Sequence, residues 1–195
     1  QNPARQTAIK SDLPVEKTAY VINQVCGSGL RAVAAGYQAI LTNDSNIIIA
    51  GGQESMSNAP KAINIYDGQK LEETNLIDTM IKDGLWDAFN GYHMGVTAEN
   101  VANKWRITRE DQDNFALLSQ TKAEKAQKEG KFKNEIVPVD LKSKKGNIIF
   151  NVDEHPREGM TIETLTRLNP AFKKNGTVTA GNASGINDGA AAVVL

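Results

Sequence analysis

The chain contains a single cysteine, Cys26, at the point where an apolar segment meets the start of a predicted helix. A thiol becomes a good nucleophile when its pKa falls, and the free N–H groups of a helix N-terminus favour the thiolate. Reactive thiols in such settings have pKa values of roughly 3.5–7.5, against about 8.5 for a free cysteine. Cys26 is therefore a candidate nucleophile, and the alternative is a buried, inert cysteine.

A thiol nucleophile usually works with a base or with donors to an oxyanion. The chain has two histidines, His93 and His155, and sequence spacing alone assigns neither of them to Cys26. The glycines of the closing segment match no phosphate-loop motif, which predicts ordinary turns. No histidine lies among acidic residues at metal-ligand spacing, so we predict no metal site.

The elements that must position Cys26 form a predicted strand–helix–strand unit. Residues 19–25 are rich in β-branched side chains, apolar residues at helical spacing predict a helix over 28–41, and NIIIAGG at 46–52 predicts the second strand. Three consecutive isoleucines in that strand are typical of a parallel strand buried on both faces. A right-handed crossover is expected between the two strands.

Beyond this unit, the segment from Ser55 to Tyr92 predicts loops with short helical turns. Thr97 can cap one helix, and Thr108 with Asp111 predicts a capping box that opens a second helix, ending near Glu129. The charge-rich surface of this second helix is interpreted as a solvated face that includes a Glu124–Lys128 pair.

The last third of the chain predicts a hairpin, a short helix and a final strand. IVPVDL at 136–141 and NIIFNVD at 147–153 flank a Lys- and Gly-containing turn, which indicates the hairpin. The short helix passes through Ile162 and Leu165, and a Gly- and Asn-rich loop leads into the apolar strand that ends at Leu195.

The amino-acid composition argues against several classes of function. The chain has 195 residues, 40% of them hydrophobic, and a formal net charge of −1, which argues against nucleic-acid or anionic-membrane partners. No apolar run approaches the roughly 20 residues that span a bilayer. One cysteine can form neither an intramolecular disulfide nor a cysteine zinc site, so we expect a reducing, cytoplasmic location. The start at Gln1 and the stop in an apolar strand are interpreted as signs of a longer protein.

Taken together, these motifs resemble the thiolase family, in particular its acetyl-CoA acetyltransferase branch. The strings that carry the resemblance, in order along nearly the whole chain, are NQVCGSGLRAV, AGGQESMSNAP, GYHMGVTAENVA, EIVPV and GTVTAGNASGINDGAAAV. The resemblance implies an α/β fold: a thiolase-like N-terminal βαβ core with a parallel or mixed sheet and an inserted α+β loop domain. Residues 1–55 would form the incomplete core with the nucleophile, 56–186 the insertion that binds coenzyme A and makes oligomer contacts, and 187–195 a strand returning to the core.

The resemblance also implies residue roles. Cys26 would take the acyl group as a thioester while coenzyme A leaves, and Met94 would line the acyl pocket. Arg157 would contact the nucleotide end of coenzyme A, where a cation suits phosphate. The positions that match the lining of the coenzyme A cleft are His93, Arg157, Phe172, Ala180 and Ser184.

The implied activity is acetyl-CoA C-acetyltransferase, which makes or cleaves acetoacetyl-CoA in fatty acid metabolism. Coenzyme A and acetyl-CoA would be substrates, no permanently bound cofactor is expected, and the parent would be a homo-oligomer, a dimer or homotetramer. Thiolases also use a second cysteine, an activating histidine and an asparagine, all in a C-terminal half absent from this chain. The isolated chain is therefore expected to have little or no Claisen activity. The alternatives are a non-catalytic coenzyme A binding or assembly module and a β-ketoacyl synthase-like condensing enzyme.

Overall fold

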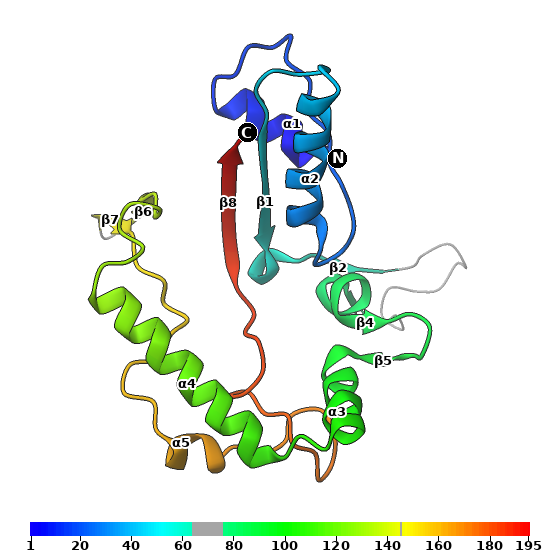
Figure 1. Cartoon of the computed structure of the whole chain (residues 1–195), viewed down its shortest axis with the longest axis vertical. Helices are drawn as coiled ribbons and strands as arrows, with labels where there is room; N and C mark the ends of the chain where they lie inside the picture. Colours follow the sequence, from blue (N-terminus) through cyan, green and yellow to red (C-terminus); the bar gives the residue numbers. More distant parts are fainter. Residues whose placement is uncertain (64–75, 145) are drawn as a thin grey trace. The chain divides into compact units, whose positions relative to one another are not determined.

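The computed structural model describes residues 1–63, 76–144 and 146–195 (Figure 1). Contacts divide the chain into two units, one made of Gln1–Gly84 with Asn187–Leu195 and the other of Leu85–Ile186. Residues 64–75 of the predicted loop-rich segment, and Lys145 in the predicted hairpin turn, lie outside the described residues. The roles expected of residues 1–55, 56–186 and 187–195 stay predictions.

The first unit begins with helix α1, Pro3–Lys10. The side chain of Asn2 caps α1 by accepting a hydrogen bond from the Arg5 N–H at 2.9 Å. Helix α2, Ser28–Leu41, has the bounds that the apolar spacing predicts. Short elements follow along the chain: the 3₁₀ turn η1 (Met56–Asn58), strands β2 (Lys61–Ala62) and β3 (Ile77–Asp78), and the π-helical segment η3 (Met80–Leu85).

Two strands far apart in the sequence pair beside α2. Strand β1, Ile49–Ser55, is antiparallel to β8, Asp188–Val194, and α2 packs on β1 (Figure 1). Gly36 permits this close packing, because a Cβ atom there would lie 2.9 Å from the Leu195 side chain and 3.0 Å from that of Ile48. The predicted final strand is confirmed, and the predicted second strand is confirmed with bounds three residues later than 46–52.

The first predicted strand is wrong. Residues 21–23 have no regular structure, and every strand pair among the described residues is antiparallel, in place of the predicted parallel pairing. A strand needs a neighbour to satisfy its N–H and C=O groups, and no described segment pairs with residues 19–23. The predicted burial of the second strand is wrong for the same reason: β1 has one partner strand, and only Ala50 is buried along it.

The second unit is built around two helices, α3 (Met94–Trp105) and α4 (Arg109–Lys128), joined by a short turn. The predicted capping box of α4 is confirmed: the Thr108 hydroxyl accepts from the Asp111 N–H at 3.1 Å, and the Asp111 carboxylate accepts from the Thr108 N–H at 2.9 Å. Its other elements are strands β4 (Trp86–Asp87), β5 (Tyr92–His93), β6 (Val139–Ser143) and β7 (Gly146–Phe150), and helix α5 (Ile162–Thr166).

Local signals also predicted the hairpin and the short helix. Strands β6 and β7 pair antiparallel from Val139 opposite Phe150 to Ser143 opposite Gly146, so the hairpin is confirmed with shorter strands than predicted. Helix α5 contains the predicted residues, and its Leu165 is fully buried. Among the described helices, none combines the length and the apolar character that crossing a bilayer requires.

Candidate active site

Cys26 is exposed, on a tight turn immediately before the Gly27 N-cap of α2. Two consecutive backbone hydrogen bonds close this turn, from the Gly27 N–H to the Gln24 carbonyl at 3.0 Å and from the Ser28 N–H to the Val25 carbonyl at 3.1 Å. The alternative of a buried cysteine is therefore wrong. The thiol instead stands at the surface at the start of a helix.

Side chains on either side of Cys26 hold the turn in a strained conformation. The Ser28 hydroxyl donates to the Val25 carbonyl at 2.7 Å and accepts from the Gln24 N–H at 2.8 Å. The Asn23 side chain accepts from the Val25 N–H at 3.0 Å. Val25 has φ = 49°, a left-handed conformation that is unfavourable for a β-branched residue and costs on the order of 1–3 kcal/mol. The residue beside the thiol thus stores strain that its neighbours maintain.

The N-terminus of α2 also differs from those of the other described α-helices. The side chains of Asn2, His93, Thr108 and Thr161 cap α1, α3, α4 and α5. No side chain caps α2; the N–H groups of Gly27 and Ser28 donate to backbone carbonyls, and no side chain competes for those that follow in the first turn. Such N–H groups carry partial positive charge and can donate to a developing anion.

His93, a predicted coenzyme A residue, is the N-cap of α3. Its Nδ1 accepts a hydrogen bond from the Gly95 N–H at 2.9 Å, so in the neutral ring the proton is on Nε2. The predicted cap at Thr97 is wrong, because α3 begins three residues before it. A histidine is a rare cap, and the pairing of β5 with β4, which sets His93 opposite Trp86, is a contact that local sequence does not reveal.

A stacked ring pair brings together two of the predicted residues. The His93 and Phe172 ring centroids are 4.8 Å apart with an angle of 18° between the rings. Gly95 allows this approach, because a Cβ atom there would lie 2.1 Å from the Phe172 ring. Met94, beside His93, is the first residue of α3 and remains partly exposed. His93 and Phe172 therefore form one cluster, and Met94 is the chain neighbour of His93.

Phe172, Ala180 and Ser184 lie on one loop, residues 170–184, and Ala180 and Ser184 are exposed. The loop closes on itself through a bridge between Pro170 and Thr179 and a hydrogen bond from the Ala171 N–H to the Val178 carbonyl at 2.9 Å. Three of the predicted residues are thus carried by a single segment.

A buried carboxylate of α3 anchors this loop. Glu99, only 2% exposed, accepts hydrogen bonds from the Thr177 N–H at 2.7 Å, the Val178 N–H at 2.8 Å and the Thr177 hydroxyl at 3.0 Å. Burial alone would raise the pKa of Glu99, but these hydrogen bonds, together with the charge of Lys173, hold that pKa below its ordinary value. Glu99 is therefore ionised at neutral pH and fastens the loop to α3.

A second buried carboxylate, Asp113 of α4, fastens the same loop from another helix. It accepts from Arg109 Nε at 2.7 Å and from Asn182 Nδ2 at 2.9 Å. Asn182 in turn donates to the Thr177 carbonyl at 3.1 Å and accepts from the Thr179 N–H at 2.8 Å. Sequence reasoning missed both acids. For Glu99, the available signal was its helical spacing with Gly95 and Ala102, the other buried residues of α3; Asp113 is the one buried residue of α4, and no such spacing marks it.

The remaining predicted residue, Arg157, is exposed in the segment 153–159, where its N–H donates to Gln120 Oε1 of α4 at 3.0 Å. His155, on the same segment, is also exposed. Cys26 belongs to the first unit, and the predicted coenzyme A residues belong to the second. No three His, Cys, Asp or Glu side chains in the described part of the chain are placed to hold a metal ion.

Comparison with known proteins identifies the type of molecule. The family model described as "Thiolase, N-terminal domain" matches residues 1–195. The acetyl-CoA acetyltransferases of Paracoccus denitrificans and Shinella zoogloeoides are 63% and 60% identical over 195 residues, all of this chain and 50% of each relative.

Solved structures give the same result. The acetyl-CoA acetyltransferase from Syntrophomonas wolfei matches with a TM-score of 0.94 and 45% identity, over 100% of this chain and 49% of that one. Human mitochondrial 3-ketoacyl-CoA thiolase matches with a TM-score of 0.92 and 42% identity, over 98% of this chain and 49% of that one. The predicted α/β fold class is confirmed, and the chain spans about half the length of the curated relatives it matches.

Proposed function

This chain belongs to the thiolase family, and from that premise we propose that it supplies the acyl-accepting part of an acetyl-CoA C-acetyltransferase. The activity would make or cleave acetoacetyl-CoA. The observation that carries the proposal is the placement of the one cysteine: Cys26 is exposed on a strained turn at the uncapped start of α2.

The first half-reaction follows from this placement. The Cys26 thiolate attacks the carbonyl carbon of acetyl-CoA, and the carbonyl π electrons move to oxygen, forming a tetrahedral oxyanion. The N–H groups that follow Ser28 in the first turn of α2, which no side chain caps, would donate to this oxyanion. When the oxyanion collapses, the bond to the coenzyme A sulfur breaks, and that sulfur leaves with the bonding pair and takes a proton. An acetyl thioester remains on Cys26.

The second unit would bind coenzyme A. The stacked rings of His93 and Phe172 offer an apolar surface, and because His93 Nδ1 accepts from the Gly95 N–H, Nε2 is left as a potential donor. Met94 would line the acyl pocket, with Ala180 and Ser184 on the adjoining loop. Arg157 would bind phosphate at the nucleotide end, because a guanidinium pairs well with phosphate oxygens.

The carbon–carbon step needs groups that this chain does not supply. It requires an enolate, whose charge must be stabilised, and a second thiol as base, whereas the 195 residues contain one cysteine. The chain by itself would therefore have little or no Claisen activity. We place the full protein in the cytoplasm, in fatty acid metabolism, as a dimer or homotetramer, with no nucleic-acid or membrane partner.

The test is acylation of the thiol. The chain is incubated with acetyl-CoA and measured by intact-mass and peptide mass spectrometry, with Cys26→Ser as the matched control. We expect one acetyl group on the Cys26 peptide of the wild type and none on the variant. The absence of an adduct on a folded wild-type chain would contradict the proposal. If coenzyme A still binds to that chain, the non-catalytic binding module is the better description.

A further inference from the structure

One face of α4 holds the segment that carries Arg157. Gln120 Oε1 accepts from the Arg157 N–H at 3.0 Å, and Glu124 Oε2 accepts from the Gly159 N–H at 3.2 Å. One turn further along, Gln127 Nε2 donates to the Asp153 carbonyl at 2.9 Å. These side chains share a face because they are three or four residues apart. Residues 153–159 are therefore fastened at both ends and in the middle.

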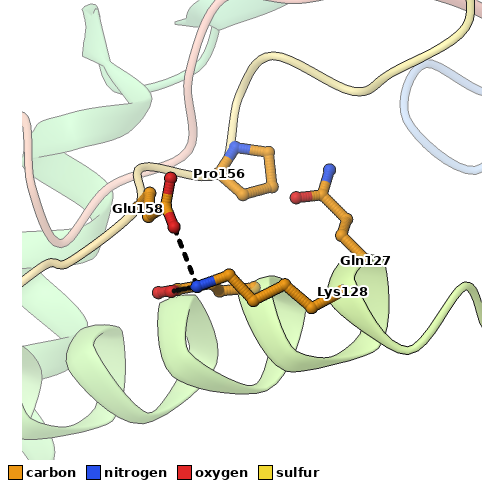
Figure 2. A pocket seen from close by; sticks show the side chains of 5 residues that line it. Gln127, Lys128, Pro156 and Glu158 are labelled. Carbon is orange, nitrogen blue, oxygen red and sulfur yellow. Dashed lines mark hydrogen bonds and ion pairs between the residues drawn. The ribbon is translucent and has the colours of Figure 1, made fainter.

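An ion triad reinforces this attachment. Lys128 Nζ lies 2.5 Å from Glu124 Oε1 and 2.8 Å from Glu158 Oε1, beside a pocket of about 260 Å³ (Figure 2). Its hydrogen bonds with Glu124 and then Glu158 raise the pKa of Lys128, and the hydrogen bond from Lys128 is the main cause of a lowered pKa for Glu124. Lys128 and Glu124 are thus charged at neutral pH, and the charge-rich face predicted as merely solvated contacts another segment.

The triad also determines which charges remain next to Arg157. Glu158, its neighbour in sequence, is paired with Lys128. Among the described residues no carboxylate forms an ion pair with the Arg157 guanidinium. Because the backbone of Arg157 is held and the neighbouring Glu158 is paired with Lys128, binding of an anion by the guanidinium costs side-chain entropy but little further backbone entropy.

We propose that Gln120, Glu124 and Lys128 form a latch that positions Arg157 for the phosphate groups of the coenzyme A substrate. The inference rests on the proposed function, which assigns coenzyme A to the second unit. The latch residues are positioning residues: Gln120 and Glu124 fix the backbone of residues 157–159, and Lys128 keeps Glu158 from competing for the guanidinium.

The test compares a substrate with nucleotide phosphates to one without them. In the full-length gene product that carries this chain, kcat and KM are measured with acetoacetyl-CoA and with acetoacetyl-pantetheine. We expect Gln120→Leu and Lys128→Gln each to raise KM for acetoacetyl-CoA about two- to fivefold, with kcat unchanged. Neither variant should change kcat/KM for acetoacetyl-pantetheine. Lys125→Gln is the control, because it removes one positive charge from α4 at a lysine whose ion pair among the described residues is with Glu129.

Arg157→Ala separates failure of this inference from failure of the proposed function. We expect Arg157→Ala to raise KM for acetoacetyl-CoA alone, and the latch variants to add nothing further in that background. If Arg157→Ala has its effect but the latch variants do not, the latch is overturned and the proposed function stands. If Arg157→Ala leaves acetoacetyl-CoA kinetics unchanged, the assigned role of Arg157 fails and the latch fails with it. Equal losses on both substrates would indicate general structural damage and would also overturn the latch.

Discussion

The Cys26 turn is the proposed site of acyl transfer, and the loop of residues 170–184 carries proposed coenzyme A-binding residues. Different kinds of hydrogen bond stabilise the two segments. Around Cys26, every hydrogen bond described above joins residues no more than four positions apart. In the loop, the carboxylates of Glu99 and Asp113 reach Thr177 and Asn182 across 78 and 69 positions. The turn is exposed and strained, whereas the carboxylates that hold the loop are buried.

From this difference we can predict which substitutions each region tolerates. A turn stabilised by its own neighbours keeps its geometry without a surrounding core, so the thiol can remain open to substrate. A loop stabilised by buried charges depends on the packing of α3, α4 and α5 around those charges. Removal of one carboxylate then leaves N–H groups without a hydrogen-bond acceptor away from water. The resulting loss of folding free energy is larger than the net free energy that the intact hydrogen bonds contribute.

The largest effect should come from breaking the loop anchor. Glu99→Ala removes the acceptor of three hydrogen bonds at a buried position and should lower the free energy of unfolding by about 2–4 kcal/mol, as measured by urea denaturation. Glu110→Ala, an exposed acid in the first turn of α4, is the control and should cost less than about 1 kcal/mol. Equal costs would show that Glu99 is not an anchor.

A pH series should show a smaller effect at the same anchor. Because the pKa of Glu99 is lowered in the folded state, its stabilising contribution is fully present above the ordinary carboxyl pKa of about 4.3. That contribution is lost as the pH falls through the lowered folded-state pKa. Unfolding free energies from about pH 6 down to pH 3 should therefore fall more steeply for the wild type than for Glu99→Gln.

Some exposed carboxylates, among them Asp111 and Glu163, also have lowered pKa values. They are present in both the wild type and Glu99→Gln, so their contributions cancel when the two pH profiles are compared. Parallel slopes for the wild type and Glu99→Gln would contradict the assigned ionisation.

The smallest effect should appear at the Cys26 turn, and it should have the opposite sign. Val25→Gly relieves a left-handed conformation at a residue that is 61% exposed, so little packing is lost. We expect the free energy of unfolding to rise by about 1 kcal/mol. Val21→Gly, at a similarly exposed valine without a positive φ, should give no gain. A loss in Val25→Gly equal to that in Val21→Gly would show that no strain is stored at the turn.

Much of the fold could be predicted because its signals are local. The apolar spacing of α2, the capping box of Thr108 and Asp111, and the hairpin of β6 and β7 each depend on residues within one or two turns of one another. The same holds for the position of Cys26 at a helix start. Family motifs spread along the chain added residues, such as Phe172, that no local rule would have selected.

The errors lie where a distant partner decides the outcome. Residues 19–23 have strand-forming side chains, but no described strand pairs with them. His93 displaced Thr97 as the cap of α3, at the end of a strand that pairs with β4. Glu99 and Asp113 look in the sequence like ordinary helix acids, and only packing against residues 165–182 buries them.

The sequence by itself therefore determined the family, the bounds of α2, the capping box of α4 and the place of the one cysteine directly before a helix. The tertiary structure alone decided which strands pair, which carboxylates are buried, and that Phe172 stacks on His93 while the Arg157 segment rests on α4. The physical reason is the range of the interactions. Caps and helical periodicity act over a few residues, whereas burial and strand pairing depend on segments that meet only after the chain has folded.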